Sequence, residues 1–373
     1  MIPSQDWDTL RPKLKPRLLA LFALAVVAFG CGDSSSGNSP TSGSTPTPSA
    51  STDGKKLKVG VVFDSGGRGD KSFNDSAYAG VERARKEFGT AIEVNTVDSK
   101  TENDFEENIT GLADSGSNLV FCVGVTQATA LGNVAPKYPD AKFAIIDAEV
   151  PGDNVRSLVF SEEQGSFLAG YLAGLVTKTG KVGFVGGKNI PLIKKFEAGY
   201  TAGARLANPA IDVLPAKYTE SWDDTSTGKA SATVLFDQGA DIVYQAAGRA
   251  GLGVITAAVE KNKPGAKRYA IGVDSDQDDE AKGVVLTSMV KHVDESVYNT
   301  IKDALDGKFS NGTKRYDLSA NGVGLTDFRN TKNDIGAANI AKVEAMAAKI
   351  KDGSLKIPEK IEDIEPFLAS AKK

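Results

Sequence analysis

VGVVFD, residues 59–64, followed by SGGRGDKSFN, residues 65–74, is the stretch that decides the fold. An apolar run ends in a carboxylate at Asp64, and a glycine-rich turn then leads to an aromatic side chain and an amide, Phe73 and Asn74. This order is typical of a buried strand that ends at a cleft and leads into a helix. Ligands of open α/β sheets bind at the ends of such strands. The stretch therefore predicts one half of a small-molecule site, and it offers no catalytic group.

Short apolar runs alternate with amphipathic stretches along the chain after residue 55. Regular alternation of strands and helices predicts parallel sheets with right-handed crossovers and helices on both faces. The pattern runs twice, because residues 57–63 and 181–185 each open a unit and lead into a Gly-Gly turn before a helix. We therefore expect an α/β fold with two lobes. The expected strands span 58–63, 92–96, 119–123, 143–146, 156–160, 181–185, 212–218, 242–245, 269–273 and 284–290, and the expected helices include 73–88, 104–115, 164–177, 191–208, 229–238 and 251–262.

Residues 1–30 have the composition of an export signal. Four Lys and Arg side chains precede an apolar run, residues 18–29, which is shorter than the roughly 20 residues needed to span a bilayer. The run ends at Ala28-Phe-Gly-Cys31, which resembles a bacterial lipobox, where the cysteine is lipidated and becomes the first residue of the mature protein. A plain secretory signal followed by an incidental cysteine is the alternative.

Residues 32–54 consist almost entirely of Ser, Thr, Gly, Pro, Asn and Asp. Such a segment buries too little apolar surface to offset its ordering entropy. We interpret residues 31–54 as a lipidated cysteine and a disordered tether. Cys122 is the only other cysteine, and without a disulfide partner it is expected to be a buried, inert thiol. The sequence thus predicts a lipid-anchored protein on the extracytoplasmic face of the cell membrane.

The composition excludes several classes of function. The full chain has a formal net charge of −4, and because residues 1–30 carry about +2, the mature chain is near −6. This acidity argues against nucleic acid as a partner, which requires a basic face. The single histidine, His292, excludes a multi-histidine metal site, and the chain contains no P-loop, HExxH motif or paired CxxC motif. We expect neither an enzyme nor a bound cofactor or metal.

Polar or flexible residues follow the apolar runs where the predicted strands end. Because the carboxyl ends of parallel strands share one edge, two facing sheets direct these residues into a single cleft. Carboxylates and an ammonium suit a ligand rich in hydroxyl and N–H groups. Taken singly, each aspartate is equally typical of a helix N-cap or a turn, so the prediction depends on the set. Its members are Asp64, Asp147, Gly248, Asp274 and Lys291, with Phe73 and Trp222 as flat faces for a planar ring, each stack contributing about 1–3 kcal/mol.

The motif Asp64-Ser-Gly-Gly, followed by Asp70-Lys-Ser-Phe-Asn74, resembles the opening motif of the basic membrane protein (BMP) family of lipoproteins. Members of this family are substrate-binding proteins of ABC importers, and they include receptors for purine nucleosides. The resemblance implies a type I periplasmic-binding-protein fold, in which two Rossmann-like lobes close on the ligand. Further matching motifs lie at residues 159–174, 182–187, 196–203, 271–277 and 322–325, so the resemblance covers nearly the whole chain after the tether.

The resemblance also implies roles for individual residues. The base would stack between Phe73 and Trp222, although the family more often has Phe at the second of these positions. Asn74 would either bond the ligand or only order its loop. The other implied contacts are Asp64 and Asp147 with the edge of the base, and Gly248, Asp274 and Lys291 with the ribose.

Together these features predict a monomeric, lipid-anchored receptor that binds a purine nucleoside and delivers it to an ABC permease and its ATPase. We expect lobe 1 to contain residues 55–160 and 287–325, and lobe 2 to contain residues 161–286 and 326–373. One alternative keeps the fold and makes the protein a sensory receptor for a sugar or another small molecule. A nucleoside hydrolase is a weaker alternative, because the N-terminal aspartates lack the spacing of a calcium-binding cluster.

Overall fold

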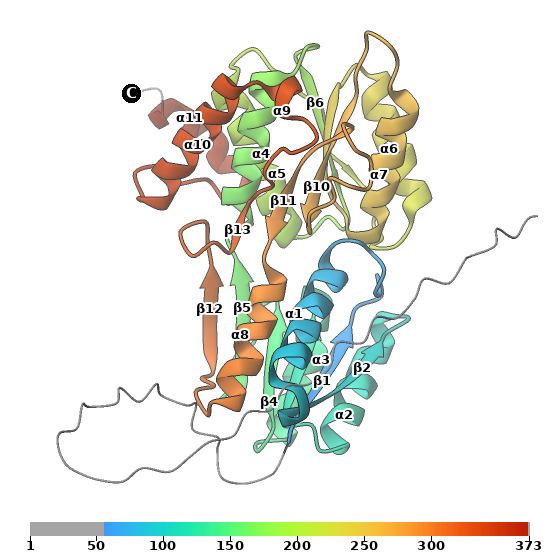
Figure 1. Cartoon of the computed structure of the whole chain (residues 1–373), viewed down its shortest axis with the longest axis vertical. Helices are drawn as coiled ribbons and strands as arrows, with labels where there is room; N and C mark the ends of the chain where they lie inside the picture. Colours follow the sequence, from blue (N-terminus) through green and yellow to red (C-terminus); the bar gives the residue numbers. More distant parts are fainter. Residues whose placement is uncertain (1–55, 372–373) are drawn as a thin grey trace, which may run out of the picture. The chain divides into compact units, whose positions relative to one another are not determined.

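The computed structural model describes residues 56–371 (Figure 1). The expected export signal, the lipobox at Cys31 and the tether lie outside the described residues. Within residues 56–371 the strands form two mainly parallel sheets, and helices cover both faces of each sheet (Figure 1). No helix in this part of the chain is long and apolar enough to cross a membrane.

The first sheet forms the core of the lobe drawn in the lower half of Figure 1. Its strand order is β12-β5-β4-β3-β1-β2, and its neighbouring strands are parallel. The central strand β3 is buried on both faces, which explains its continuous apolar sequence. The strands are β1 (Leu57–Phe63), β2 (Ile92–Asp98), β3 (Leu119–Val123), β4 (Lys142–Ile146), β5 (Val155–Phe160) and β12 (Gly312–Tyr316).

The second sheet forms the core of the other lobe. Its strand order is β13-β11-β10-β9-β6-β7, with β8 also paired to β6. Only β13 is antiparallel to its neighbour within the described part of this sheet. The strands are β6 (Lys181–Gly186), β7 (Asp212–Val213), β8 (Lys217–Tyr218), β9 (Ile242–Ala246), β10 (Tyr269–Asp274), β11 (Val285–Lys291) and β13 (Val323–Leu325).

The helices pack in pairs on the sheet faces. In the first lobe α1 packs with α8 on one face, and α2 packs with α3 on the other. In the second lobe α4 and α5 cover one face, while α6 and α7 cover the other. The helices are α1 (Phe73–Phe88), α2 (Phe105–Asp114), α3 (Ala128–Val134), α4 (Glu162–Val176), α5 (Pro191–Ala207), α6 (Thr225–Asp237), α7 (Gly251–Lys261), α8 (Val293–Leu305), α9 (Lys332–Ile335), α10 (Ala337–Lys351) and α11 (Ile364–Ala371).

Glycines allow α4 and α5 to approach each other closely. A Cβ atom on Gly170 would lie 1.9 Å from the carbonyl oxygen of Tyr200, and one on Gly203 would lie 2.1 Å from that of Phe167. Neither distance is sterically possible, so both positions require glycine. The Ala-Gly pairs of these helices therefore allow the close packing of α4 against α5 in the second lobe. Residues of α5 also line the ligand cavity.

The chain crosses between the lobes three times within the described residues. It crosses after β5, after β11, and between β12 and β13. Residues 287–291, which are expected in lobe 1, belong to β11 and pair with β10 in the second sheet. Residues 323–325 form β13, which likewise pairs with β11 in the second sheet. Of the chain after the first crossing, only the segment between β11 and β13, which contains α8 and β12, belongs to the first lobe.

Candidate ligand-binding site

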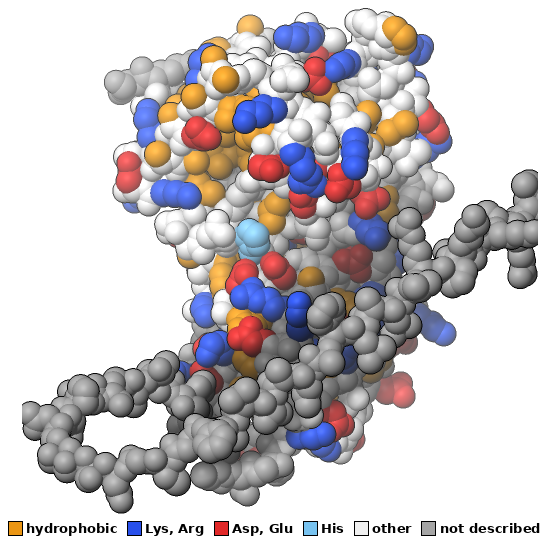
Figure 2. Space-filling view, in the orientation of Figure 1, with side chains coloured by type: hydrophobic (Ala, Val, Ile, Leu, Met, Phe, Trp, Pro, Cys, Tyr) orange, Lys and Arg blue, Asp and Glu red, His pale blue; other side chains and the backbone are white. Residues whose placement is uncertain are grey.

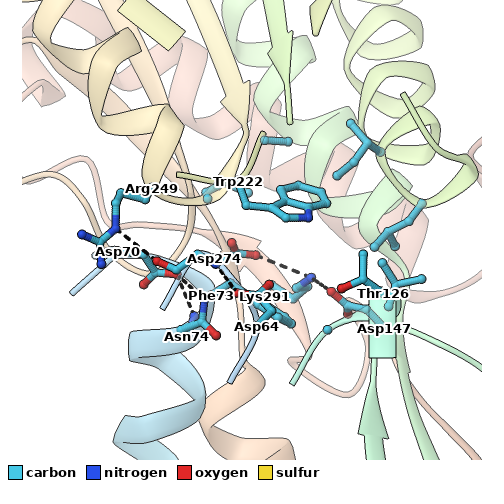
Figure 3. Close-up of a pocket in the computed structure, with 18 of the residues that line it drawn as sticks. Asp64, Asp70, Phe73, Asn74, Thr126, Asp147, Trp222, Arg249, Asp274 and Lys291 are labelled. Carbon is cyan, nitrogen blue, oxygen red and sulfur yellow. Dashed lines mark hydrogen bonds and ion pairs between the residues drawn. The ribbon is translucent and has the colours of Figure 1, made fainter. Parts of the chain in front are cut away.

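A cavity of about 550 Å³, part of it open to solvent, lies between the two lobes (Figure 3). The structure brings every predicted ligand contact to this one cavity: Asp64, Phe73, Asn74, Asp147, Trp222, Gly248, Asp274 and Lys291 all line it.

The glycine-rich loop after β1 is folded around two buried carboxylates. Asp64 accepts hydrogen bonds from the backbone N–H of Gly66 at 2.9 Å and from Asn74 Nδ2 at 2.8 Å. Asp70 accepts hydrogen bonds from the backbone N–H of Ser72, which precedes α1, and from that of Asn74, the second residue of α1. The amide nitrogen of Asn74 thus orders the loop, while its Oδ1 has no hydrogen-bond partner among the described residues.

Burial changes the acidity of Asp64. Its carboxyl is almost fully enclosed, and this desolvation raises the pKa of Asp64 to about 6, although the hydrogen bond from Asn74 opposes the rise. The neighbouring Asp70 carboxylate contributes further to the higher pKa. Asp64 is therefore an acceptor whose charge depends on pH in the mildly acidic range.

A buried ammonium group occupies another part of the cavity, at the end of β11. Lys291 is 2 % exposed, and its Nζ donates a 2.7 Å hydrogen bond to Asp147 Oδ2 and lies 3.6 Å from Asp274 Oδ1. Burial alone would lower the pKa of Lys291, but the carboxylates of Asp147 and Asp274 raise it above its ordinary value. The Nζ also lies 4.8 Å from the centre of the Phe73 ring, within reach of a cation–π interaction. Lys291 is therefore a permanent cation in this part of the cavity.

Two of the aspartates have a left-handed backbone. The φ angles are 70° at Asp147, directly after β4, and 62° at Asp274, the last residue of β10. Left-handed conformations are uncommon outside glycine and are enriched at functional sites, where the surrounding structure maintains them. Both carboxylates are thus turned toward the cavity by the way their strands end.

Trp222 supplies a flat face from the second lobe, as Figure 3 shows. Its indole packs against the turn after β6, where a Cβ atom on Gly187 would lie 2.3 Å from the ring. Gly248, with a φ of 57°, lies beside the backbone of Trp222. Gly187 therefore makes room for the indole. The indole Nε1 is buried without a hydrogen-bond partner among residues 56–371.

The loop of the first lobe is hydrogen-bonded to the second lobe. Ser72 Oγ donates to Asp274 Oδ2 at 2.7 Å, and Ser275 Oγ donates to the carbonyl oxygen of Ser72 at 2.8 Å. Gln277 Nε2 donates to the carbonyl oxygen of Lys71 at 3.0 Å. These contacts join residues about 200 positions apart in the chain, and they hold the lobes together along the cavity.

Arg249 adds a second set of contacts between the lobes. Its Nε donates to the carbonyl oxygen of Gly66 at 3.1 Å, and its Nη2 donates to that of Arg68 at 2.7 Å. An ion pair between Lys188 of the second lobe and Glu102 of the first lies beyond the loop. The described lobes are therefore in a closed arrangement.

Several residues of the site are not predicted by the sequence. Arg249 immediately follows Gly248, but nothing in the sequence indicates that its guanidinium reaches the other lobe. Ser72 lies within the motif of residues 70–74, and this position is the sequence signal from which its role at the site could be inferred. Phe196, the first residue of another quoted motif, also lines the cavity. The other cavity residues absent from the prediction are Gly66, Asp70, Gly124, Val125, Thr126, Leu192, Ile193, Ala246 and Val273.

The chemistry of the cavity is that of recognition. Carboxylates offer acceptors, Lys291 offers a donor, and the rings of Phe73 and Trp222 offer flat apolar faces. Among residues 56–371, no group of three or more His, Cys, Asp and Glu side chains is arranged to hold a metal ion.

Cys122 is free and buried in β3, as expected, and burial raises the pKa of its thiol far above its ordinary value. On the face shown in Figure 2, Lys and Arg side chains are interspersed with Asp and Glu side chains.

Comparison with known proteins identifies relatives of this chain. The Bmp family, described as "ABC transporter substrate-binding protein PnrA-like", matches residues 57–361. The chain is 34% identical over 367 residues to the "ABC transporter nucleoside-binding protein BmpA" of Lactococcus lactis, covering 93% of this chain and 100% of that protein. It is 37% identical over 312 residues to an "uncharacterized lipoprotein" of Pyrococcus abyssi, covering 81% of this chain and 75% of that protein.

The fold is also found in a solved structure. A solute-binding protein of an ABC transporter system from Aeropyrum pernix K1 is similar to this chain with a TM-score of 0.78 and 29% sequence identity. The similarity covers 84% of this chain and 99% of that one. The α/β fold with two lobes expected from the sequence is confirmed, and it is the type I periplasmic-binding-protein fold.

Proposed function

Because the chain belongs to the Bmp family of PnrA-like ABC transporter substrate-binding proteins, we propose that it captures a purine nucleoside between its lobes and delivers it to an ABC permease and ATPase. Proteins of this family bind substrates for transport and are not enzymes. The observation that carries the proposal is the division of the cavity into two chemically different parts. One part combines flat rings with the Asp64–Asn74 pair, and the other combines Lys291 with two carboxylates.

The first part suits a purine base. Phe73 belongs to the first lobe and Trp222 to the second, so a planar ring between them would contact both lobes. Aromatic stacking of a base contributes about 1–3 kcal/mol. The carboxylate of Asp64 and the unpartnered Oδ1 of Asn74 are acceptors for N–H groups on the edge of the base.

The second part suits a ribose. Asp274 can accept hydrogen bonds from sugar hydroxyls, and Lys291 can donate to their oxygens. Gly248 lies in the turn after β9 on the same lobe as Asp274. Asp147 accepts its hydrogen bond from Lys291 and not from the Asp64 loop. We therefore group Asp147 with the proposed ribose contacts, in contrast to the contact with the base that the family resemblance implied.

Closure of the lobes is the proposed mechanism of capture. A ligand that contacts both lobes binds the closed state more tightly than the open state and therefore shifts the population toward it. The hydrogen bonds of Ser72 and Arg249 between the lobes would add to this preference, since lobe opening separates their partners. Delivery to the permease then requires the lobes to open again.

A lipid anchor at Cys31 completes the proposal. Relatives with the same domain are named lipoproteins, and a lipid chain would keep a monomeric receptor on the extracytoplasmic face of the membrane near its permease. Labelling of cells with a palmitate analogue should mark the wild-type protein. The Cys31→Ser variant should stay unlabelled and should partition into the aqueous phase of a detergent extraction. Labelling of the variant would contradict the anchor.

Calorimetric titration of the folded body, residues 55–373, tests the ligand directly. The protein is first unfolded and refolded to remove carried-over ligand, and is then titrated with inosine, guanosine, adenosine, cytidine, ribose and hypoxanthine. We expect tight binding of purine nucleosides and little binding of ribose or of the free base, because each of these fills only one part of the cavity. Preferential binding of ribose, or no binding at all, would contradict the nucleoside assignment.

A further inference from the structure

A buried carboxyl group behind the site has no hydrogen bond. Glu162 is the first residue of α4, immediately after the first crossing between the lobes, and it is 1 % exposed. Neither of its side-chain oxygens has a hydrogen-bond partner among the described residues. Glu162 does not line the cavity either. Because burial of an unpartnered carboxyl group is unfavourable, its position calls for an explanation.

Two ammonium groups flank the carboxyl of Glu162. Its Oε1 lies 3.9 Å from Lys291 Nζ, and its Oε2 lies 4.0 Å from Lys195 Nζ. Lys291 ends β11 at the second crossing, and Lys195 lies on α5, where the next residue, Phe196, lines the cavity. Glu162, at the first crossing, therefore lies near both Lys291 at the second crossing and Lys195 on α5.

Lys291 is surrounded by carboxyl groups from two directions. Asp147 and Asp274 approach its ammonium from among the residues that line the cavity, at 2.7 and 3.6 Å. Glu162 approaches from outside the cavity. One ammonium group cannot compensate three buried carboxylates, so the charge of Glu162 determines how firmly Lys291 is held from behind.

We propose that Glu162 is a positioning residue that holds the ammonium of Lys291 from outside the cavity and thereby tunes ligand affinity without touching the ligand. The proposal rests on the proposed function in one respect, namely that Lys291 contacts the ligand. It also implies that the first crossing acts on the ligand through Lys291, because Glu162 directly follows that crossing.

The charge of Glu162 is sensitive to pH near neutrality. Burial raises the pKa of Glu162 to about 8, and Lys291 is the strongest opposing influence. Lys291 keeps its proton in this range, because its own pKa is raised. The carboxylate that attracts Lys291 therefore forms as the pH rises through about 8. The charged and titratable groups that face Glu162 from other elements are Lys291, Asp147, Lys195 and Tyr244.

The Glu162→Gln variant provides the main test, because glutamine resembles the protonated form and cannot ionise. Wild type, Glu162→Gln and the control Glu163→Gln are titrated with adenosine, whose base does not ionise between about pH 6.5 and about pH 9. Glu163 is the adjacent buried carboxyl, and no ion pair joins it to Lys291 among the described residues. At about pH 6.5 we expect all three proteins to agree within about twofold. At about pH 9 Glu162→Gln should bind about fivefold more weakly than wild type, while Glu163→Gln follows wild type. Equal affinities of Glu162→Gln and wild type at both pH values would overturn the proposal.

A second comparison separates action through Lys291 from a general structural effect. In a Lys291→Gln background, Glu162→Gln should no longer change adenosine affinity at about pH 9. A full effect in that background would contradict the positioning role.

If wild type binds no nucleoside, the proposed function fails. Wild type, Glu162→Gln, Lys291→Gln and the variant that carries both substitutions are then compared by thermal unfolding without ligand. Non-additive shifts in Tm at about pH 9 would support the contact between Glu162 and Lys291, and additive shifts would refute it. If Lys291→Gln fails to fold, the Tm values of Glu162→Gln and wild type are compared over a range of pH. Equal Tm values of the two proteins above about pH 8 would refute the contact.

Discussion

Ser72 of the first lobe donates a 2.7 Å hydrogen bond to the carboxylate of Asp274 in the second lobe. Both residues are buried, and the carbonyl group of Ser72 accepts a further hydrogen bond from Ser275, the neighbour of Asp274. The loop that follows β1 is thus bonded at a single residue to the end of β10. Because this bond joins the lobes, it exists only while they are closed.

Removal of this hydroxyl should weaken ligand binding. The Ser72→Ala variant loses a hydrogen bond to a charged acceptor, a loss of about 1 kcal/mol or somewhat more, which corresponds to at least fivefold in Kd. Calorimetric titration with the best purine nucleoside measures the change. Ser65→Ala in the same loop is the control, because no hydrogen bond of the Ser65 hydroxyl occurs in the described part of the chain. An unchanged Kd for Ser72→Ala would show that the bond does not favour the closed state.

Replacement of Arg249 should make the closed state shorter-lived. Its guanidinium binds two carbonyl oxygens of the opposite lobe, and neither Gln nor Lys can reproduce the forked geometry. We expect Arg249→Gln to raise the dissociation rate of the ligand about tenfold, as measured by stopped-flow fluorescence. Arg205→Gln removes an arginine whose partner, Glu365, lies in the same lobe, and this control should leave the rate unchanged. Equal rates in both variants would argue against the role of Arg249 in closure.

Trp222 should report and stabilise the bound base. It is the only tryptophan after Trp7, so a change in the fluorescence of the folded body on ligand addition reports on the cavity. Trp222→Phe keeps a flat ring and removes the unpartnered Nε1–H, and it should change affinity by no more than about threefold. Trp222→Ala should lose about 1–3 kcal/mol of stacking, roughly 5- to 150-fold in Kd. Similar affinities for the Phe and Ala variants would rule out stacking on this residue.

Gly187→Ala tests whether the turn after β6 makes room for the indole. The new Cβ atom would lie 2.3 Å from the ring of Trp222, so the indole must move, and nucleoside affinity should fall toward that of Trp222→Ala. Gly132→Ala in α3 is the matched control, because its new Cβ atom meets nothing within 4 Å and alanine favours a helix. The control should bind normally and be as stable as wild type or more so. Normal binding by Gly187→Ala would show that the position of the indole is not critical.

Asp64 should make stability depend on pH in the acidic range. The pKa of Asp64 is raised by burial from an ordinary value of 3.8 to about 6. Between these values the folded protein binds the proton and the unfolded chain releases it. The contribution of Asp64 to folding stability is therefore largest below about pH 4 and falls as the pH rises to about 6. Wild type should lose up to about 3 kcal/mol relative to Asp64→Asn over this interval. Urea unfolding of both proteins at several pH values measures the difference, and parallel profiles would contradict the raised pKa.

The sequence predicted the fold and the position of the cavity well, because both depend on local patterns. The strand 119–123 and the helix 73–88 were predicted with the bounds that the structure has. Polar residues such as Asp64 and Asp274 stand at the ends of apolar strands, and parallel topology then brings them to one edge. Such an inference needs only the spacing of residues along the chain.

Features that depend on distant partners could not be predicted in the same way. The expected strand 212–218 is split into β7 and β8, which pair separately with β6. Residues 287–291 are expected in lobe 1, but pairing with β10 places them in the second sheet. The hydrogen bond between Asp147 and Lys291, which lie 144 positions apart, likewise could not be predicted from the sequence. In each case tertiary contacts determine the partner of a strand or side chain, and the local sequence does not indicate that partner.

The left-handed backbone at Asp147 and Asp274 determines which substitutions are informative there. An alanine at either position would remove a carboxylate and also destabilise the backbone, since a residue with a Cβ atom but no local polar group disfavours this conformation by roughly 1–2 kcal/mol. Alanine scanning would therefore exaggerate the importance of both side chains for the ligand. Asparagine tolerates the left-handed region and has nearly the same shape as aspartate, so Asp→Asn exchange isolates the negative charge. Conversely, a glycine at these positions would relieve the backbone strain, and directed evolution toward anionic ligands has a route through Asn or Gly that leaves the ends of both strands intact.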